Sequence, residues 1–315
     1  MNRRNLLTSG ISMIAGAAAG SAQSTALAAR RAGVADTRTP SRAAATFITS
    51  HDGTALFCRD WGEGVPIVFA SPWALGSDWW EYQMAGLTAR DMRCVAYDRR
   101  GQDRSEQPRG GYEFDPLSDD LAAVINGLDL RRVTLVGQSM GAGEVVRYLA
   151  RHGTSRVARV VLIAPITPRV LKSADNPDGF DPAFLVKVRA ALCKDRPGNI
   201  AAAAPAFFGS PANAVSAEMM QWWAQMLLRC PLNVMLSLHR AFTEADFTDD
   251  LHAVRCPTLI IHGDQDASVS LDLTGRPTAK LISGSRLQIY EGAAHGLPIT
   301  HTERLNEDLR MFATA

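Results

Sequence analysis

The sequence predicts an α/β fold in which a mostly parallel sheet of eight strands carries helices on both faces and a helical cap is inserted between two strands. From Ala45 onward, short apolar runs alternate with segments of helical periodicity, which is typical of such a sheet. Between Pro165 and Leu251 this alternation stops, and the stretch is too long for a plain loop. A chain of 315 residues with 46% hydrophobic content is long enough to bury one large core.

The first two expected strands flank His51-Asp52-Gly53, a turn sequence that predicts a hairpin. An antiparallel pair therefore opens the sheet. Six further apolar runs are short enough to be strands buried within a parallel sheet. The eight expected strands are Thr46–Thr49, Ala55–Arg59, Pro66–Ala70, Cys94–Tyr97, Val133–Val136, Val160–Ala164, Thr258–Ile261 and Leu287–Tyr290.

Helical patterns fill the intervals between these strands. The expected core helices are Trp79–Ala89, Pro116–Leu128, Gly141–His152, Thr278–Ile282 and Thr302–Phe312. The core is thus expected to comprise residues 45–165 and 251–315, and residues 166–250 to form the cap. Three helices are expected in the cap, at Pro182–Leu192, Ala217–Leu228 and Asn233–Thr243. We expect the cap to roof a pocket with Met219, Met220, Trp222, Trp223 and Met226, unless these side chains only fill the interior of the cap.

The net charge limits the classes of partner. Lys and Arg number 33 and Asp and Glu number 32, a net charge of +1, so no basic surface for nucleic acid is indicated and a small substrate is favoured.

The chain has five cysteines, an odd number, so at least one is unpaired. Cys94 and Cys256 adjoin apolar runs and are expected to fill the core, whereas Cys193 and Cys230 both lie in the cap, and the sequence leaves open whether they pair. No Cys and His spacing typical of a metal site is present.

Residues 1–28 have the pattern of an export signal rather than of the fold. Arg3-Arg4 precedes a weakly apolar run from Ile11 to Ala22, and Ala26-Leu27-Ala28 has the small-residue spacing that signal peptidase accepts. The segment resembles a bacterial twin-arginine signal. It predicts an exported protein, periplasmic or secreted, with no membrane span once the signal is removed. A cytoplasmic protein with an irregular N-terminus is the alternative.

The most specific local pattern is Gly137-Gln138-Ser139-Met140-Gly141, which follows an expected strand and precedes an expected helix. This placement is typical of a nucleophilic serine on a tight, strained turn, where side chains at the two glycine positions would collide with the crossing strand and helix. A purely structural turn is the alternative. A serine hydroxyl also needs a general base and an acid that orients the base.

Both partners follow in the expected chain order. His295 lies in Gly292-Ala293-Ala294-His295-Gly296 directly after the last strand, where a loop can bring an imidazole over the nucleophile. The acid is expected in the loop after the preceding strand, where Asp264 and Asp266 compete. Asp264 follows Gly263 closely enough to cap the turn, so Asp266 is favoured as the acid.

An oxyanion hole requires two backbone N–H groups. Met140, the residue after Ser139, supplies one. The second is expected from the loop after the third strand, and since Pro72 has no N–H, Trp73 is the natural donor.

Several segments together resemble the cofactor-free, non-heme bacterial haloperoxidases, which are also described as arylesterases and perhydrolases. The similarity runs from about Pro66 to the C-terminus. It rests on Tyr97-Asp98-Arg99-Arg100-Gly101, Ser105, Gly137–Tyr148, Asp175–Gly179, Phe247–Leu251 and Glu291–Leu297. The resemblance implies an α/β-hydrolase fold, a triad of Ser139, Asp266 and His295, an oxyanion hole from Trp73 and Met140, and no metal, heme or other cofactor.

The chain departs from this family at several positions. The family has His-Gly at Ser71-Pro72 and Phe at Gln138, next to the expected oxyanion site. It also has Gly at Asp103 and Ala142, and Pro at Ser270. Gln138 either adds a polar contact or reaches solvent, and Ser71-Pro72 changes the loop that holds Trp73.

These observations predict a serine hydrolase that cleaves small carboxylic esters through an acyl-enzyme on Ser139, with perhydrolase or haloperoxidase chemistry as a side reaction. Perhydrolysis as the main activity is an alternative, and a cofactor-free lyase or a ligand receptor on the same fold are others. An enzyme with an aspartate nucleophile is disfavoured because the elbow holds Ser139. Acyl and alcohol preference, activity on lactones or amides and the oligomeric state are not indicated by the sequence.

Overall fold

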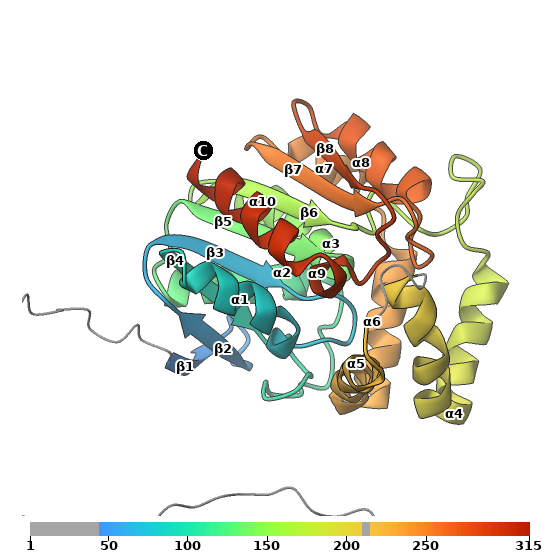
Figure 1. Ribbon diagram of the computed structural model, residues 1–315. Coiled ribbons are helices and arrows are strands. Elements are labelled where there is room, and N and C mark those ends of the chain that lie inside the picture. The colour runs from blue at the N-terminus through green and yellow to red at the C-terminus, as the bar shows by residue number, and fades with distance from the viewer. Residues whose placement is uncertain (1–43, 210–214) are drawn as a thin grey trace, which may run out of the picture. The chain divides into compact units, whose positions relative to one another are not determined.

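The computed structural model describes residues 44–209 and 215–315, and the predicted export signal at residues 1–28 lies outside them. The described residues contain an eight-stranded sheet in the order β1-β2-β4-β3-β5-β6-β7-β8, with helices on both faces (Figure 1). The strands are β1 Ala44–Thr49, β2 Ala55–Trp61, β3 Val65–Ala70, β4 Met92–Tyr97, β5 Val133–Gln138, β6 Val157–Ile163, β7 Thr258–Gly263 and β8 Arg286–Tyr290. The predicted fold is thereby confirmed.

Strand direction changes at one end of the sheet only. β1 pairs with β2 as the predicted hairpin, and β2 pairs with β4 in the same antiparallel sense. The other pairs, from β4–β3 to β7–β8, are parallel. Every residue of the central strand β5 is buried, which fits its mainly apolar sequence and its position under helices on both faces. The carboxyl ends of β3, β5, β7 and β8 therefore meet at one edge of the sheet.

The core helices form one layer on each face. On one face α1 (Glu81–Thr88), preceded by the 3-10 turn η1 (Ser77–Trp80), packs against α10 (Thr302–Thr314). On the other, α3 (Met140–His152) packs against α2 (Phe114–Gly127) and α7 (Thr248–Ala253). Figure 1 shows α1 and α10 in front of the sheet and α2 and α3 behind it. The remaining short helical segments are η3 (Leu271–Gly275), α8 (Arg276–Leu281) and α9 (Leu297–Thr300).

Three helices between β6 and β7 form the cap: α4 (Pro182–Phe208), α5 (Ala217–Arg229) and α6 (Leu232–Glu244). They lie together at the right-hand side of Figure 1. The predicted end of the cap at residue 250 falls inside α7, which packs on α3 of the core. Arg229 of α5 ties the cap to the core through ion pairs with Asp78 at 2.7 Å and Asp103 at 2.5 Å.

The predicted helix Pro182–Leu192 forms the first part of α4, and a second helical segment that continues to Phe208 was not predicted. The chain kinks at Asp195, where φ is −152° and ψ is 79°, and then becomes helical again. The Asp195 carboxylate accepts a hydrogen bond from the Gly198 N–H at 2.9 Å, so it caps the second helical segment. Pro197 lies in the first turn of that segment, where a missing N–H costs nothing. The Pro-Gly pair thus begins a helix instead of breaking one.

No helix of the described ranges is long and apolar enough to cross a membrane. All five cysteines are free thiols, with Cys193 exposed and Cys230 buried, so the structure contains no bond between them. Cys94 is buried as expected, whereas Cys256 is only partly so.

Candidate active site

Ser139 occupies the turn between β5 and α3 in a strained conformation, with φ of 54° and ψ of −116°. The neighbouring glycines allow the chain to cross here. A Cβ atom at Gly137 would lie 2.4 Å from the Gly141 carbonyl oxygen, and one at Gly141 would lie 2.2 Å from the Ala70 carbonyl oxygen. This is the close approach that the two glycines predict. The turn presents the serine at the N-terminus of α3, where helix N–H groups lack intrahelical partners.

His295 and Asp266 lie side by side, on the loops that follow β8 and β7. The His295 Nδ1 atom is 2.6 Å from Asp266 Oδ2, and both residues are buried. The other carboxylate oxygen, Oδ1, accepts hydrogen bonds from the N–H groups of Ser268 and Val269 at 2.8 and 3.0 Å. Burial alone would raise the pKa of Asp266, but the charge and hydrogen bond of His295, together with His262, outweigh burial and hold the pKa well below its usual range. Asp266 is therefore a carboxylate at neutral pH.

His262 is a functional neighbour that the sequence reasoning missed. Its Nε2 atom lies 3.4 Å from Asp266 Oδ2 and 3.0 Å from the Val269 carbonyl oxygen. It is fully buried at the end of β7, so its ring fixes the loop that holds the carboxylate. The feature of the sequence that could have indicated this contact is that His262 precedes Asp266 by four residues.

Asp264, the competing carboxylate, lies elsewhere. Its Oδ1 atom accepts a hydrogen bond from the Gly292 N–H at 2.7 Å, which joins the loop after β7 to the loop after β8. The structure thus places His295 against Asp266, whereas Asp264 connects the two loops through its hydrogen bond with Gly292.

Gln138 makes the polar contact that was one of its two expected roles. Its side chain is completely buried, its Oε1 atom accepts from the Trp79 indole N–H at 2.6 Å, and its Nε2 atom donates to the His295 carbonyl oxygen at 2.9 Å. The residue before Ser139 therefore holds the backbone of His295 across 157 positions of sequence. We infer that Gln138 positions the imidazole relative to the serine.

Replacing Gln138 by Leu is expected to lower kcat about tenfold and the free energy of unfolding by about 1–3 kcal/mol, because the His295 carbonyl and the Trp79 indole lose their partner. Urea unfolding and ester hydrolysis by the folded variant measure the two effects. Gln83→Leu is the matched control, since Gln83 is equally buried and donates to the Pro298 carbonyl at 2.7 Å. A control that loses as much kcat as Gln138→Leu would contradict the positioning role.

The side chain of Arg99 holds the loop that is expected to complete an oxyanion hole. The buried guanidinium donates to the Ser71 carbonyl at 2.7 Å and the Pro72 carbonyl at 3.3 Å, and it forms an ion pair with Glu144 of α3. Ser71 Oγ in turn donates to the Gly76 carbonyl at 3.0 Å. Within the described residues nothing accepts a hydrogen bond from the Trp73 backbone N–H, while its indole N–H donates to the Met235 carbonyl at 2.9 Å.

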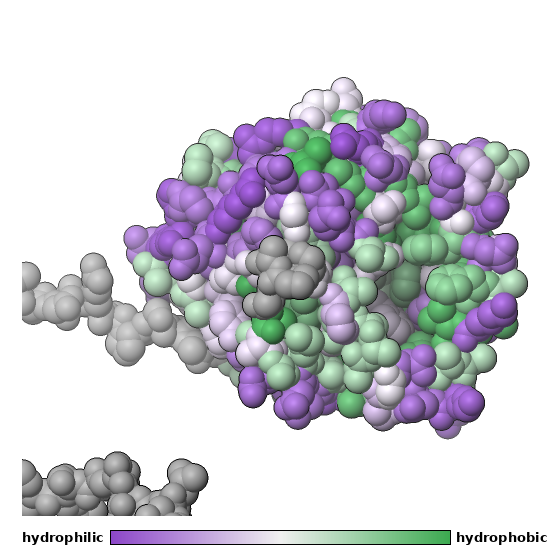
Figure 2. Space-filling view, turned by 45° about the vertical axis from the view of Figure 1, so that its right-hand side comes forward, coloured by the Kyte–Doolittle hydropathy of each residue, from purple (hydrophilic) through white to green (hydrophobic). Residues whose placement is uncertain are grey.

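Ser139 and His295 both face one cavity of about 650 Å³, a size suited to a small molecule. The described residues contain no hydrogen bond between the Ser139 hydroxyl and the imidazole. The walls are mainly apolar and come from the core loops and from all three cap helices, with Trp73, Phe207 and Trp223 among them. Figure 2 shows hydrophobic residues gathered around a hollow on the right-hand half of the molecule. Of the predicted cap residues, Trp223 lines this cavity, whereas Met226 is fully buried and does not line it.

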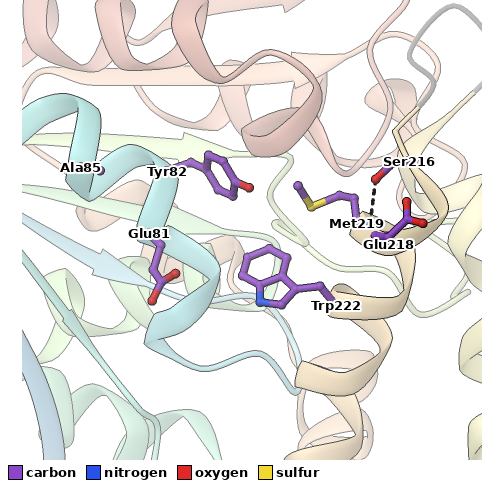
Figure 3. Close-up of a pocket in the computed structure, with 7 residues that line it drawn as sticks. All are labelled: Glu81, Tyr82, Ala85, Ser216, Glu218, Met219 and Trp222. Atoms are coloured by element: carbon purple, nitrogen blue, oxygen red, sulfur yellow. Dashed lines mark hydrogen bonds between the residues drawn. The ribbon is translucent and has the colours of Figure 1, made fainter. Parts of the chain in front are cut away.

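A second, more open hollow of about 540 Å³ lies between α1 and α5. Figure 3 shows Tyr82 and Trp222 facing each other across it, and their ring centroids are 6.1 Å apart. Met219 and Glu218 complete the α5 side. Neither Ser139 nor His295 lines this hollow, so Met219 and Trp222, which are both partly buried, lie outside the cavity of Ser139. In the described part of the chain, no group of three or more His, Cys, Asp or Glu side chains could hold a metal ion.

Comparison with known proteins agrees with this fold. A family model described as the alpha/beta hydrolase fold matches residues 65–302. A non-heme haloperoxidase from Rhodococcus erythropolis is 38% identical over 270 residues, which cover 84% of this chain and 98% of that protein. A bifunctional esterase/perhydrolase from Acinetobacter calcoaceticus is 34% identical over 275 residues, with the same coverage. The crystal structure of a bromoperoxidase from Bacillus anthracis matches with a TM-score of 0.83 and 34% identity, covering 86% of this chain and all of that one.

The chain therefore belongs to the α/β-hydrolase family, in the group that includes the non-heme haloperoxidases and the esterase/perhydrolases.

Proposed function

We propose that the protein is a carboxylic ester hydrolase that works through an acyl-enzyme on Ser139. The observation that carries this proposal is the buried His295–Asp266 pair, which shares an apolar cavity with a serine on a strained turn. A serine so placed can approach a carbonyl carbon, and a neutral imidazole held by a carboxylate can take its proton. The esterase activity in the name of the Acinetobacter relative agrees with this proposal.

In the acylation step, Ser139 Oγ attacks the ester carbonyl carbon while His295 Nε2 takes the hydroxyl proton. Nε2 is the free nitrogen because Nδ1 faces Asp266. The backbone N–H groups of Trp73 and Met140 hold the negative oxygen of the tetrahedral intermediate, in the role that backbone donors have in oxyanion holes. The carbon–oxygen bond then breaks, and the leaving alcohol receives the proton from His295.

Deacylation repeats these steps with water as the nucleophile and His295 as the base, which releases the acid and restores Ser139. Hydrogen peroxide in place of water yields a peracid, which can oxidise halide outside the protein. We propose this perhydrolysis as a side reaction of the same acyl-enzyme, and the haloperoxidase and perhydrolase names of the relatives support it.

The release of p-nitrophenol from p-nitrophenyl acetate, followed with and without hydrogen peroxide, tests both the ester hydrolysis and the perhydrolysis. We expect turnover without peroxide, and peracid formation that rises with peroxide at the expense of acetate. Peroxide-dependent halogenation that persists in Ser139→Ala would show that the oxidation does not pass through the acyl-enzyme. Absence of any ester turnover would leave a lyase or a receptor as the function.

Export of the protein remains a proposal that rests on the pattern of residues 1–28. Expression of the full chain in a bacterium with a twin-arginine pathway, followed by N-terminal sequencing, tests it. A periplasmic protein beginning near Ala29 is expected, and an uncleaved cytoplasmic chain would contradict export.

A further inference from the structure

The cavity of Ser139 contains a second imidazole, which belongs to His239 of α6. His239 lines the cavity and is only 5% exposed. Two other polar lining residues, Lys187 and Asn199, are exposed and therefore mark the rim. His239 is thus a polar group set deep in a mainly apolar wall, where an unpaired donor is costly.

The contact between His239 and Arg189 favours one tautomer of the imidazole. The Arg189 guanidinium lies 3.5 Å from Nδ1. A guanidinium only donates, so this contact favours Nδ1 as the acceptor and the proton of the neutral ring on Nε2. Burial, followed by the charge of Arg189, lowers the pKa of His239 to about 4, so the ring is neutral at neutral pH.

The Nε2–H group has no partner among the described residues, although the ring itself is firmly held. Its centroid lies 5.5 Å from that of Trp73 and 5.0 Å from that of Phe242, both in edge-to-face contacts. The nearby Thr243 hydroxyl donates to the His239 carbonyl at 2.8 Å and is therefore already in use. The fixed ring leaves one neutral donor for a bound molecule.

We propose that His239 is a specificity-determining residue that donates a hydrogen bond to an oxygen atom of the substrate other than the reacting carbonyl. The preferred substrates are esters with an ether, hydroxyl or second carbonyl oxygen in the acyl or alcohol part, rather than pure hydrocarbon esters. This inference rests on the proposed ester hydrolase function. Its physical basis is that a hydrocarbon ester would leave the Nε2–H group buried without water or partner.

Pairs of esters that differ by one oxygen test the proposal. p-Nitrophenyl methoxyacetate and p-nitrophenyl butyrate place an ether oxygen or a CH₂ at the same position of the acyl chain. 2-Methoxyethyl and butyl acetates do the same for the alcohol. The quantity to measure is the ratio of kcat/KM within each pair, because it does not depend on the fraction of folded enzyme.

His239→Phe is expected to lower this ratio about tenfold in at least one pair, relative to the wild-type enzyme, because one hydrogen bond is lost. Comparison with the wild-type ratio removes the intrinsic difference in reactivity of the two esters. Ile166→Val is the matched control, since Ile166 lines the same cavity, has no side-chain donor and is not one of the rings packed on His239. It is expected to change both esters of a pair by the same factor.

Two results would overturn the assignment: unchanged ratios in both pairs, or the same change of ratio in His239→Phe and Ile166→Val. A wild-type enzyme that hydrolyses none of the four esters would instead contradict the proposed function, so the two failures are distinguishable.

Discussion

Ser139→Ala is expected to lower kcat for p-nitrophenyl acetate by about ten thousandfold or more, since no acyl-enzyme can form without the hydroxyl. The cavity and the oxyanion donors remain, so the residual rate stays above that of water. The substitution removes one atom from a turn whose strain lies in the backbone. The variant is therefore expected to fold and to bind substrate with little change.

Steady-state kinetics of the purified variant measure this loss, and circular dichroism verifies the fold. Ser237→Ala is the control, because Ser237 is exposed on α6 and donates only to the Asn233 carbonyl at 3.0 Å. We expect the control to keep the wild-type rate. Equal rates for Ser139→Ala and the wild type would remove the serine mechanism.

Asp266→Asn is expected to lower kcat about a thousand- to ten-thousandfold with little change in KM. The carboxylate lies 2.6 Å from His295 Nδ1 and favours the tautomer with hydrogen on that atom, which leaves Nε2 free to accept the serine proton. An amide removes the charge that stabilises the imidazolium and permits the wrong tautomer. The low pKa of Asp266 means that the wild-type residue supplies this charge throughout the neutral range.

The same substitution at Asp264 is the matched control, because the two carboxylates are two positions apart and only Asp266 contacts His295. Asp264→Asn keeps an oxygen that can accept from the Gly292 N–H. We expect kcat to fall by less than about tenfold. A larger loss at Asp264 than at Asp266 would show that the acid has been assigned to the wrong residue.

The sequence predicted the sheet because each strand is a short apolar run at a regular interval. It also predicted the positions of Ser139, Asp266 and His295 at one edge, because all three follow strands that point the same way. Parallel strands bring such residues together regardless of their distance in the chain. The sequence favoured Asp266 over Asp264 as the partner of His295 but could not decide between them. The geometry of the loop determines which carboxylate reaches the ring.

The surroundings of the site were much harder to predict. Gln138 bonds to the His295 backbone and His262 to the Asp266 loop through contacts between distant segments, which leave no periodic pattern. The second half of α4 was missed because Pro197 and Gly198 are usual helix breakers, and the capping contact of Asp195 is visible only in three dimensions. His239 lies on a helix whose pattern does not distinguish a cavity wall from an interior face.

The most direct test of the central claim is the site of covalent modification by an alkyl fluorophosphonate, which traps a nucleophilic serine as a stable adduct. Our account predicts one phosphonyl group per chain, found on the peptide that contains Ser139, with loss of esterase activity in proportion to labelling. It also predicts no labelling of Ser139→Ala and much slower labelling of Asp266→Asn. Labelling at another residue, or full labelling without loss of activity, would contradict the acyl-enzyme on Ser139.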